Sequence, residues 1–428
     1  MKKYRIITNS EREKFACERL WYFSSIEGLS AYDTPAPFRH GTIIHTGIDF
    51  IVEQQWRGVL ATREMIVENI VEPWISRRRE SSPRDIADDE EFAALAADML
   101  AGYAKFWHHD DTAAWNWKSY EIPIARAIVH PVTGLPLIDK VDGAPRQWLY
   151  AGKIDKLGMS RVGKDLGGPR WWLSEIKTTS ANSLQDYCAK LDWDRQTRGY
   201  AWMLRQPFAY DETANTEPIN VAGVVYDVLR KAAPSPPEMT KNGKLSVAAR
   251  LTTRELYERA IHENKLDPDD YRDHLEKLGG LEQFFHRARY PFSDDEVEAF
   301  GEEIGWVALR MIEAERSPFH PPQMRLCRSG GHATGCPGGF DQLCVEDGPM
   351  ARSSFAVTSI RHAELPTPLC EPIVRIGAGK ARATGFIKVK SAEEKRKEEI
   401  SFDEPTTQID DNDEDPFGLF GEPADHAD

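Results

Sequence analysis

Hydrophobic and polar residues follow two different periods along this chain, and the order of these periods predicts its elements. Apolar residues recur with helical spacing after residue 45 and again over 85–112 and 183–204, as expected for helices with one buried face. Strand-like alternation or β-branched runs occupy residues 115–128, 148–155, 171–177 and 221–229. This order of helices, three strands, a helix and a further strand predicts an α/β fold in which helices pack on a mixed β-sheet.

Two of the predicted strands carry acidic residues and a lysine. Asp155 ends the run 148–155, and Glu175 and Lys177 lie in the run 171–177. Because side chains alternate along a strand, Glu175 and Lys177 share one face. A glycine-rich turn between the two runs would form a hairpin and bring Asp155 beside Glu175. Two carboxylates and a lysine could hold Mg²⁺ or Mn²⁺ and assist phosphodiester hydrolysis, although a solvated strand face contains the same residue types.

Three polar residues outside these strands are further candidates. His45 lies on the first turn of a predicted helix, and a hydrogen-bonded structural histidine is the alternative interpretation. Gln196 and Tyr200 are four residues apart, so they share one face of the predicted helix 183–204.

Cysteines near the C-terminal end of the patterned region suggest a second metal site. Three of them lie within eighteen residues, amid glycine and proline, at positions Cys327, Cys336 and Cys344. Clustered thiols select Zn²⁺ or an iron–sulfur cluster, and either metal centre takes four ligands. The candidates for the fourth ligand are His332, Cys17, Cys188 and Cys370. Spacing alone does not choose among these four.

Composition indicates where the protein is located in the cell and distinguishes an acidic C-terminal tail. The net charge is −15, but residues 401–428 hold ten Asp and Glu and no Lys or Arg. The tail therefore carries −10 and the other 400 residues carry −5, which leaves room for a local basic groove. No apolar stretch approaches the ~20 residues of a membrane span, and the N-terminus lacks the apolar run of a signal peptide. These features predict a cytoplasmic protein without structural disulfides.

Several of these residues occur in the order of a known set of motifs. The chain contains Gly41-Thr42-Ile43-Ile44-His45, Gly152-Lys153-Ile154-Asp155, Glu175-Ile176-Lys177 and Gln196-x-x-x-Tyr200. This series resembles the RecB-type branch of the PD-(D/E)XK nuclease superfamily, although Ile154 stands in place of the proline of that family. The resemblance implies a restriction-endonuclease-like mixed β-sheet flanked by helices.

The resemblance also implies roles for these residues. The implied ligands of Mg²⁺ or Mn²⁺ are His45, Asp155, Glu175 and the backbone carbonyl of Ile176. Lys177 would act with Asp155 and Glu175 in catalysis. Gln196 and Tyr200 would position DNA near the phosphate that is cleaved.

One subset of the family, which includes exonucleases of CRISPR adaptation, holds an iron–sulfur cluster with one N-terminal and three C-terminal cysteines. The residues that resemble these ligands are Cys17, Cys327, Cys336 and Cys344. The resemblance implies a [4Fe–4S] cluster that joins the two ends of the nuclease domain, while the long gap after Cys327 keeps Zn²⁺ as an alternative.

The predicted organisation has three parts. They are a RecB-type nuclease domain over 1–346 (core 115–230, helical insertion 250–315, Cys-rich segment 320–346), a poorly defined extension over 347–389, and a disordered acidic tail over 390–428.

By resemblance, the expected function is that of a phage-like stand-alone exonuclease that hydrolyses DNA ends in recombination, repair or replication. The alternatives are a non-catalytic subunit that binds DNA ends and a restriction-like endonuclease. The acidic tail resembles segments that recruit partners, so it could bind a single-strand annealing or single-strand-binding recombination protein. A merely solubilising tail is the other interpretation.

Overall fold

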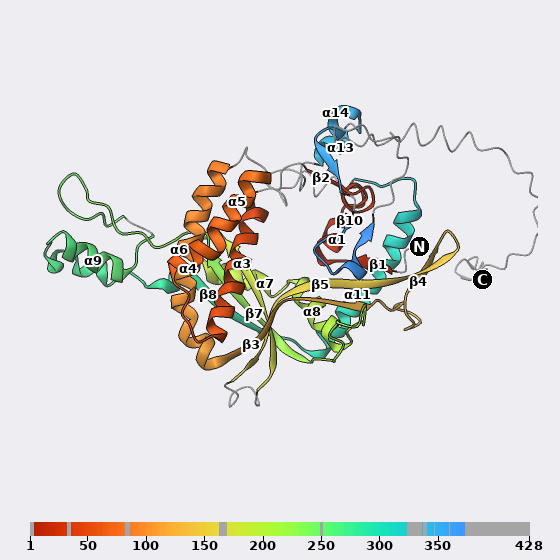
Figure 1. Ribbon diagram of the computed structural model, residues 1–428, viewed down its shortest axis with the longest axis horizontal. Coiled ribbons are helices and arrows are strands. Elements are labelled where there is room, and N and C mark those ends of the chain that lie inside the picture. The colour runs from red at the N-terminus through yellow and green to blue at the C-terminus, as the bar shows by residue number, and fades with distance from the viewer. Residues whose placement is uncertain are drawn as a thin grey trace, which may run out of the picture. The chain divides into compact units, whose positions relative to one another are not determined.

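A seven-stranded mixed β-sheet forms the centre of the computed structural model (Figure 1). The structure describes residues 4–31, 36–81, 86–161, 169–248, 251–322, 336, 340–345, 347–358 and 360–372. These residues fall within one unit, Met1–Arg375. Cys327, His332 and the tail 390–428 lie outside the described residues.

The sheet has β5 at its branching point. Its strands are β1 (Tyr4–Ile7), β3 (Trp115–Ala127), β4 (Ile138–Val141), β5 (Ala144–Ser160), β6 (Trp171–Thr179), β7 (Val221–Arg230) and β8 (Phe285–Pro291). The main path runs β1-β5-β6-β7-β8, and β3 and β4 also pair with β5. The pairs β1–β5 and β6–β7 are parallel and the others are antiparallel. The mixed sheet flanked by helices that was expected from the sequence is therefore confirmed.

Helices cover both faces of the sheet because its strands are apolar on both sides. On one face, α8 (Arg195–Arg205) and α11 (Asp294–Arg316) pack against buried strand residues such as Tyr226. On the other face, α3 (Ala36–Trp56) and α6 (Ile86–Ala114) pack against residues such as Leu229 (Figure 1). Burial of both faces accounts for the β-branched run that predicted β7.

The shorter elements lie between and beyond these layers. The remaining α-helices are α1 (Asn9–Lys14), α2 (Glu18–Trp21), α4 (Arg63–Ile66), α5 (Glu72–Ser81), α7 (Leu184–Leu191), α9 (Arg254–Glu263), α10 (Arg272–Leu275), α13 (Asp341–Val345) and α14 (Pro349–Arg352). The remaining strands are β2 (Leu29–Ala31), β9 (Phe355–Val357), β10 (Ile360–Arg361) and β11 (Glu371–Pro372). Among the described helices, none is both long enough and apolar enough to cross a bilayer.

Two segments differ from their expected structure. The predicted helix 183–204 is two helices, α7 and α8, because Asp194 caps α8 by accepting a hydrogen bond from the Gln196 N–H at 2.8 Å. The segment expected to be a helical insertion, 250–315, also contributes β8, which extends the central sheet beside β7.

The C-terminal part of the unit returns to its N-terminal part. The nuclease domain was expected to stop at residue 346, whereas β9 beyond it pairs with β2. Arg5 of β1 is buried and forms ion pairs with Glu11 and, at 2.6 Å, with Glu315 of α11. His362 lies 3.1 Å from the other carboxylate oxygen of Glu11. Buried ion pairs therefore join β1 and α1 to residues more than 300 positions away in the chain.

A second buried ion network lies under the α3–α6 layer. Asp227 of β7 is fully buried and accepts hydrogen bonds from Lys156 Nζ at 2.9 Å, Tyr103 Oη at 2.8 Å and Arg287 Nε at 2.5 Å. Lys156 is also fully buried. Because it follows Asp155 in β5, the network fixes the strand that carries Asp155.

Candidate active site

The pairing of β5 with β6 places the two predicted carboxylates side by side. Lys156 pairs with Ser174, so Asp155 and Glu175 are the next residues along these antiparallel strands. The Asp155 Oδ2 atom accepts a hydrogen bond from the Ile176 N–H at 2.9 Å. The hairpin inferred from the sequence thus brings these residues together.

Lys177 connects the strand residues to the helix that follows. Its Nζ lies 2.7 Å from Glu175 Oε1, 3.2 Å from Gln196 Oε1 and 3.6 Å from Asp194 Oδ2. Gln196 in turn donates a hydrogen bond from Nε2 to Tyr200 Oη at 2.7 Å. One hydrogen-bonded chain therefore runs from β6 into α8.

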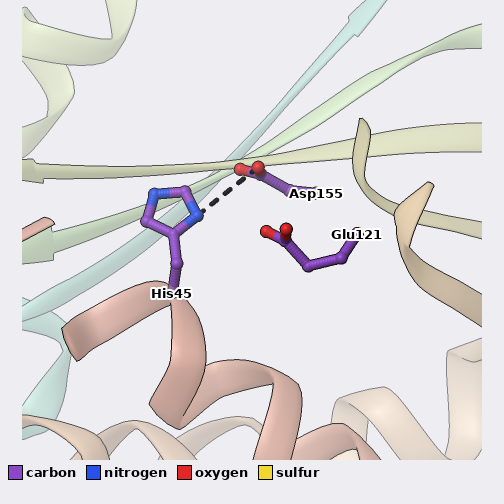
Figure 2. A group of neighbouring side chains, drawn as sticks. All are labelled: His45, Glu121 and Asp155. Atoms are coloured by element: carbon purple, nitrogen blue, oxygen red, sulfur yellow. Dashed lines mark ion pairs between the residues drawn. The ribbon is translucent and has the colours of Figure 1, made fainter. Parts of the chain in front are cut away.

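His45 reaches the same place from α3. Its Nδ1 lies 3.4 Å from Asp155 Oδ1. Glu121 of β3 completes a group with His45 and Asp155, in which one ligand atom from each residue lies within 4.8 Å of the others. Figure 2 shows the imidazole and the two carboxylates pointing toward one another.

Three acidic residues of this site, Asp49, Asp194 and Glu121, were not expected from the sequence. Asp49 follows His45 by one helical turn, and this spacing of four residues was a usable signal. Asp194 caps α8 and could have been recognised as an Asp just before a helical pattern. Glu121 gives no signal in its own segment, because only the pairing of β3 with β5 brings it to Asp155.

Burial and crowding of the carboxylates shift their proton affinities. Burial raises the pKa of Glu175 to about 7, with Asp155 adding to the shift and Lys177 opposing it. Burial likewise raises the pKa of Asp49 to about 7, with His45 opposing and Asp155 adding to the shift. Burial alone would raise the pKa of Asp155, but the charge and hydrogen bond of His45 lower it. The site therefore concentrates negative charge in a poorly solvated space.

The residues present fit a hard divalent cation. Glu175 is 3% exposed, yet its Oε2 has no hydrogen-bond partner among the described residues. A buried carboxylate oxygen without a donor needs a compensating charge or ligand. Carboxylate oxygens with one imidazole suit Mg²⁺ or Mn²⁺, and His45, Asp155 and Glu175 can supply them.

The described cysteines divide into three locations. Cys17, Cys336 and Cys344 belong to one apolar cluster with Phe23 and Phe340. Cys188 lies in the main core, where burial raises its pKa to about 11. The Cys370 Sγ contacts backbone carbonyls of its own loop, including that of Leu365 at 3.1 Å. The fourth predicted cysteine, Cys327, lies outside the part of the chain that the structure describes.

Comparison of the sequence with models of known protein families finds a match to one superfamily. A model of the PD-(D/E)XK nuclease superfamily matches residues 10–337, which is most of the chain. One solved structure similar to this chain is titled "Crystal structure of SSO0001", with 11% sequence identity and a TM-score of 0.22 over 62% of this chain and 81% of that one. Among curated proteins, none has a sequence that matches.

Proposed function

The chain belongs to the PD-(D/E)XK nuclease superfamily, and on this premise we propose that it is a Mg²⁺- or Mn²⁺-dependent exonuclease of the RecB type that hydrolyses DNA ends. The observation that carries the proposal is the position of Lys177, whose ammonium contacts Glu175 and Gln196 beside Asp155. The same ammonium reaches Gln196, which hydrogen-bonds to Tyr200, so Lys177 joins the two carboxylates to the polar residues of α8. Recombination, repair or replication of the phage type is the proposed setting, in a bacterial or phage-infected cytoplasm.

Each residue has a distinct part in this reaction. His45, Asp155, Glu175 and the carbonyl of Ile176 would hold the cation, which polarises the phosphate and lowers the pKa of water. Lys177 offsets the charge that develops on the phosphate oxygens. Gln196 and Tyr200 hold the DNA backbone next to Lys177.

Packing keeps Tyr200 in this position. A Cβ atom at Gly152 would lie 2.7 Å from the Tyr200 ring, so only glycine on β5 allows the ring to approach the strand so closely. The glycine of the Gly152–Asp155 segment therefore has a packing role in addition to its place in the motif.

The test is digestion of end-labelled linear DNA and covalently closed circular DNA, with Mg²⁺ or Mn²⁺. We expect wild type to remove the label from linear DNA only and Lys177→Ala to lose at least about 100-fold in rate. Lys105→Ala, which changes an exposed lysine of α6, serves as the matched control and should keep the wild-type rate.

Each other outcome favours a different function. Cleavage of closed circles by wild type would indicate a restriction-like endonuclease. DNA binding without turnover in either metal would indicate the non-catalytic end-binding subunit. Full activity of Lys177→Ala would reject the assigned catalytic residues.

We further propose a [4Fe–4S] cluster held by Cys17, Cys327, Cys336 and Cys344, with Zn²⁺ as the alternative metal. The proposal is supported by the apolar cluster that contains Cys17 together with Cys336 and Cys344, although Cys17 precedes them by more than 300 residues in the chain. Anaerobically purified protein should contain about four iron and four sulfide per chain and absorb visible light, and Cys336→Ser should lose the iron, the sulfide and the visible absorption. Zinc in place of iron would select the alternative, and neither metal would reject the site.

The acidic tail 390–428 is proposed to bind a single-strand annealing or single-strand-binding recombination protein. Its run of acidic residues followed by Pro416-Phe417 combines charge with an apolar anchor, the pattern of a short recruiting segment. Truncation after about residue 400 should abolish partner binding and leave cleavage of naked DNA intact. Unchanged partner binding would reject a recruiting role.

A further inference from the structure

A half-exposed tryptophan ends the helix that enters the candidate active site. Trp56 is the last residue of α3 and is 51% exposed. The helix stops at Gly58, whose φ is 73°. The Gly58 N–H donates to the Gln55 carbonyl at 3.0 Å, and the Val59 N–H donates to the Gln54 carbonyl at 2.9 Å. These two bonds form the Schellman ending of a helix, so the backbone that carries the tryptophan is fixed.

Two further contacts hold the indole ring of Trp56. Its Nε1–H donates to the Trp117 carbonyl at 2.8 Å. Its ring packs on Tyr120, with 5.6 Å between the ring centroids and 34° between the ring planes, and Tyr120 in turn donates a hydrogen bond from Oη to Glu53. The indole is therefore held in one orientation although half of it faces solvent, and it has little rotamer freedom left to lose when a ligand covers it.

A β-bulge in β3 places a lysine next to this ring. Trp117 pairs with Gly158 and Ser119 pairs with Leu157, so Lys118 is an extra residue that has no partner on β5. Lys118 is exposed, and it directly follows the carbonyl that accepts the indole hydrogen bond. The bulge therefore fixes the tryptophan and directs a cation into the solvent beside it.

The basic residues of this surface are unpaired, whereas acidic residues near it have partners. Arg57 follows the tryptophan and is exposed, as Lys118 is, and within the described part of the chain neither side chain forms an ion pair. Glu53 accepts the hydrogen bond of the tyrosine, and Glu121 pairs with Lys153. The charge that remains available at the surface is positive and suits phosphate.

The same helix connects this surface to the candidate active site. His45, Asp49 and Glu53 are spaced by four residues and share one face of α3. Trp56 follows His45 by 11 residues, which is about 16 Å along the helix axis. Burial raises the pKa of Asp49 to about 7, so this residue carries only part of a negative charge near neutral pH. A strand of a few nucleotides can therefore reach from the cleavage residues to Trp56.

The exposed apolar surface suits an unpaired base. Val59 and Leu60, 40% and 42% exposed, extend it beyond the tryptophan. Aromatic rings combined with cations are how proteins bind single-stranded nucleic acid, because every base has a face that can stack. In a duplex each base is paired and already stacked on its neighbours, so its face is not available to the ring.

We propose that Trp56, supported by Tyr120, is a stacking platform for a base of single-stranded DNA, and that Arg57 and Lys118 bind the adjoining phosphates. The platform rests on the proposed nuclease function and names its substrate more closely, since the DNA strand passes unpaired over the end of α3. Trp56 is thus a positioning residue, which acts on nucleotides next to the one that is cut.

The experiment measures the affinity of the full-length protein for a fluorescein-labelled oligothymidylate and for a labelled blunt duplex, by fluorescence anisotropy in EDTA to prevent cleavage. We expect Trp56→Ala to weaken binding of the single strand by roughly 5- to 150-fold and binding of the duplex by less than about twofold. Trp56→Phe keeps an aromatic face and should recover most of the loss. Trp306→Ala is the matched control, because it removes a tryptophan of α11 that is 54% exposed, and it should bind both DNAs as wild type does.

The salt dependence of binding tests the two cations. Arg57→Gln and Lys118→Gln should each reduce the slope of log affinity against log salt by about 0.7 for the single strand. Lys105→Gln, which changes an exposed lysine of α6, is the control and should keep the wild-type slope. Wild-type slopes in Arg57→Gln and Lys118→Gln would overturn the phosphate contacts.

The outcomes separate the platform from the proposed catalytic residues. Wild-type affinity of Trp56→Ala for the single strand, or equal losses for single strand and duplex, would overturn the platform. A loss in Trp306→Ala as large as that in Trp56→Ala would also overturn it. Full cleavage by Lys177→Ala, with Trp56→Ala still defective in single-strand binding, would instead reject the catalytic residues and leave the platform in place.

Discussion

Asp227→Asn tests whether the buried ion network under the catalytic strands stabilises the fold. The substitution keeps the shape of the side chain and removes its charge, which leaves Lys156 fully buried and Arg287 4% exposed beside a neutral group. Arg287 keeps its ion pairs with Asp110 and Asp111 at 2.7 and 2.8 Å, so the loss falls mainly on Lys156. Breaking a buried pair in this way costs about 3–5 kcal/mol.

This cost can be converted into a melting temperature. The folded unit spans Met1–Arg375, and unfolding entropy is roughly 2.1 cal/mol/K per residue, which gives about 0.8 kcal/mol/K for the unit. We therefore expect the Tm to fall by about 4–6 °C. Thermal unfolding followed by circular dichroism measures the change, and a fall of less than about 1 °C would refute the energetic role of the network.

The double variant and the pH dependence sharpen the test. Lys156→Met combined with Asp227→Asn removes both charges and should recover part of the lost stability, since an apolar replacement of a buried pair is often tolerated. Burial would raise the pKa of Asp227, but Arg287 and Lys156 lower it well below its usual value. Its contribution is therefore present above about pH 4 and is lost as the pH falls. The Asp227→Asn variant should lose less stability than wild type between pH 5 and pH 2, and parallel curves would contradict this.

The remaining predictions concern other parts of the molecule. Gly199→Ala in α8 should lower the free energy of unfolding by about 1–3 kcal/mol, because its Cβ would lie 2.9 Å from two aromatic rings. Gly41→Ala in α3 meets nothing within 4 Å and should raise the free energy of unfolding by about 0.5–1 kcal/mol. Denaturant unfolding that ranks the two variants the other way would refute the packing argument. Trp193 is 78% exposed next to the capping residue of α8 and should stack on a DNA base. Trp193→Ala should therefore weaken single-stranded DNA binding, measured by fluorescence anisotropy, by about 1–3 kcal/mol. Trp306→Ala, which removes a tryptophan that is 54% exposed, is the control, and equal effects of the two variants would argue against stacking. Burial would raise the pKa of Glu11, but its arginine and histidine partners lower it well below its usual value. The stabilising contribution of the Glu11 carboxylate is therefore lost as the pH falls below about 4. Glu11→Gln should make the free energy of unfolding depend less on pH in that range.

Periodicity predicted the strands that are buried or strongly alternating, and it failed where pairing partners decide the structure. β5, β6 and β7 follow from their apolar patterns. β8, Phe285–Pro291, contains His286, Arg287 and Arg289 and gives no clear alternation of buried residues. It is a strand because β7 offers a free edge, and because Asp227 of β7 binds Arg287.

The same distinction holds for the candidate site. Asp155, Glu175 and Lys177 could be related to one another from the sequence, because strand geometry and a single turn connect them. Glu121 lies 34 positions before Asp155, in a strand whose register with β5 no local pattern specifies. Asp194 falls in a break that the predicted helix 183–204 did not include. Contacts across one short turn could be inferred from the sequence, whereas contacts that depend on the register of strands far apart in the chain could not.

The pairing of β2 with β9 and the contact of Glu11 with His362 have a consequence for synthesis of the chain. At about 5–20 residues per second, a ribosome needs roughly 10–30 s to pass from residue 200 to residue 372. During that time the catalytic strands are already translated, while β2 still lacks its partner β9 and Glu11 still lacks His362. These N-terminal contacts can form only when nearly the whole unit has been made, whereas the strands of the central sheet end at Pro291. The last contacts to form during synthesis are therefore those that hold the N-terminal segment, and not those that assemble the candidate active site.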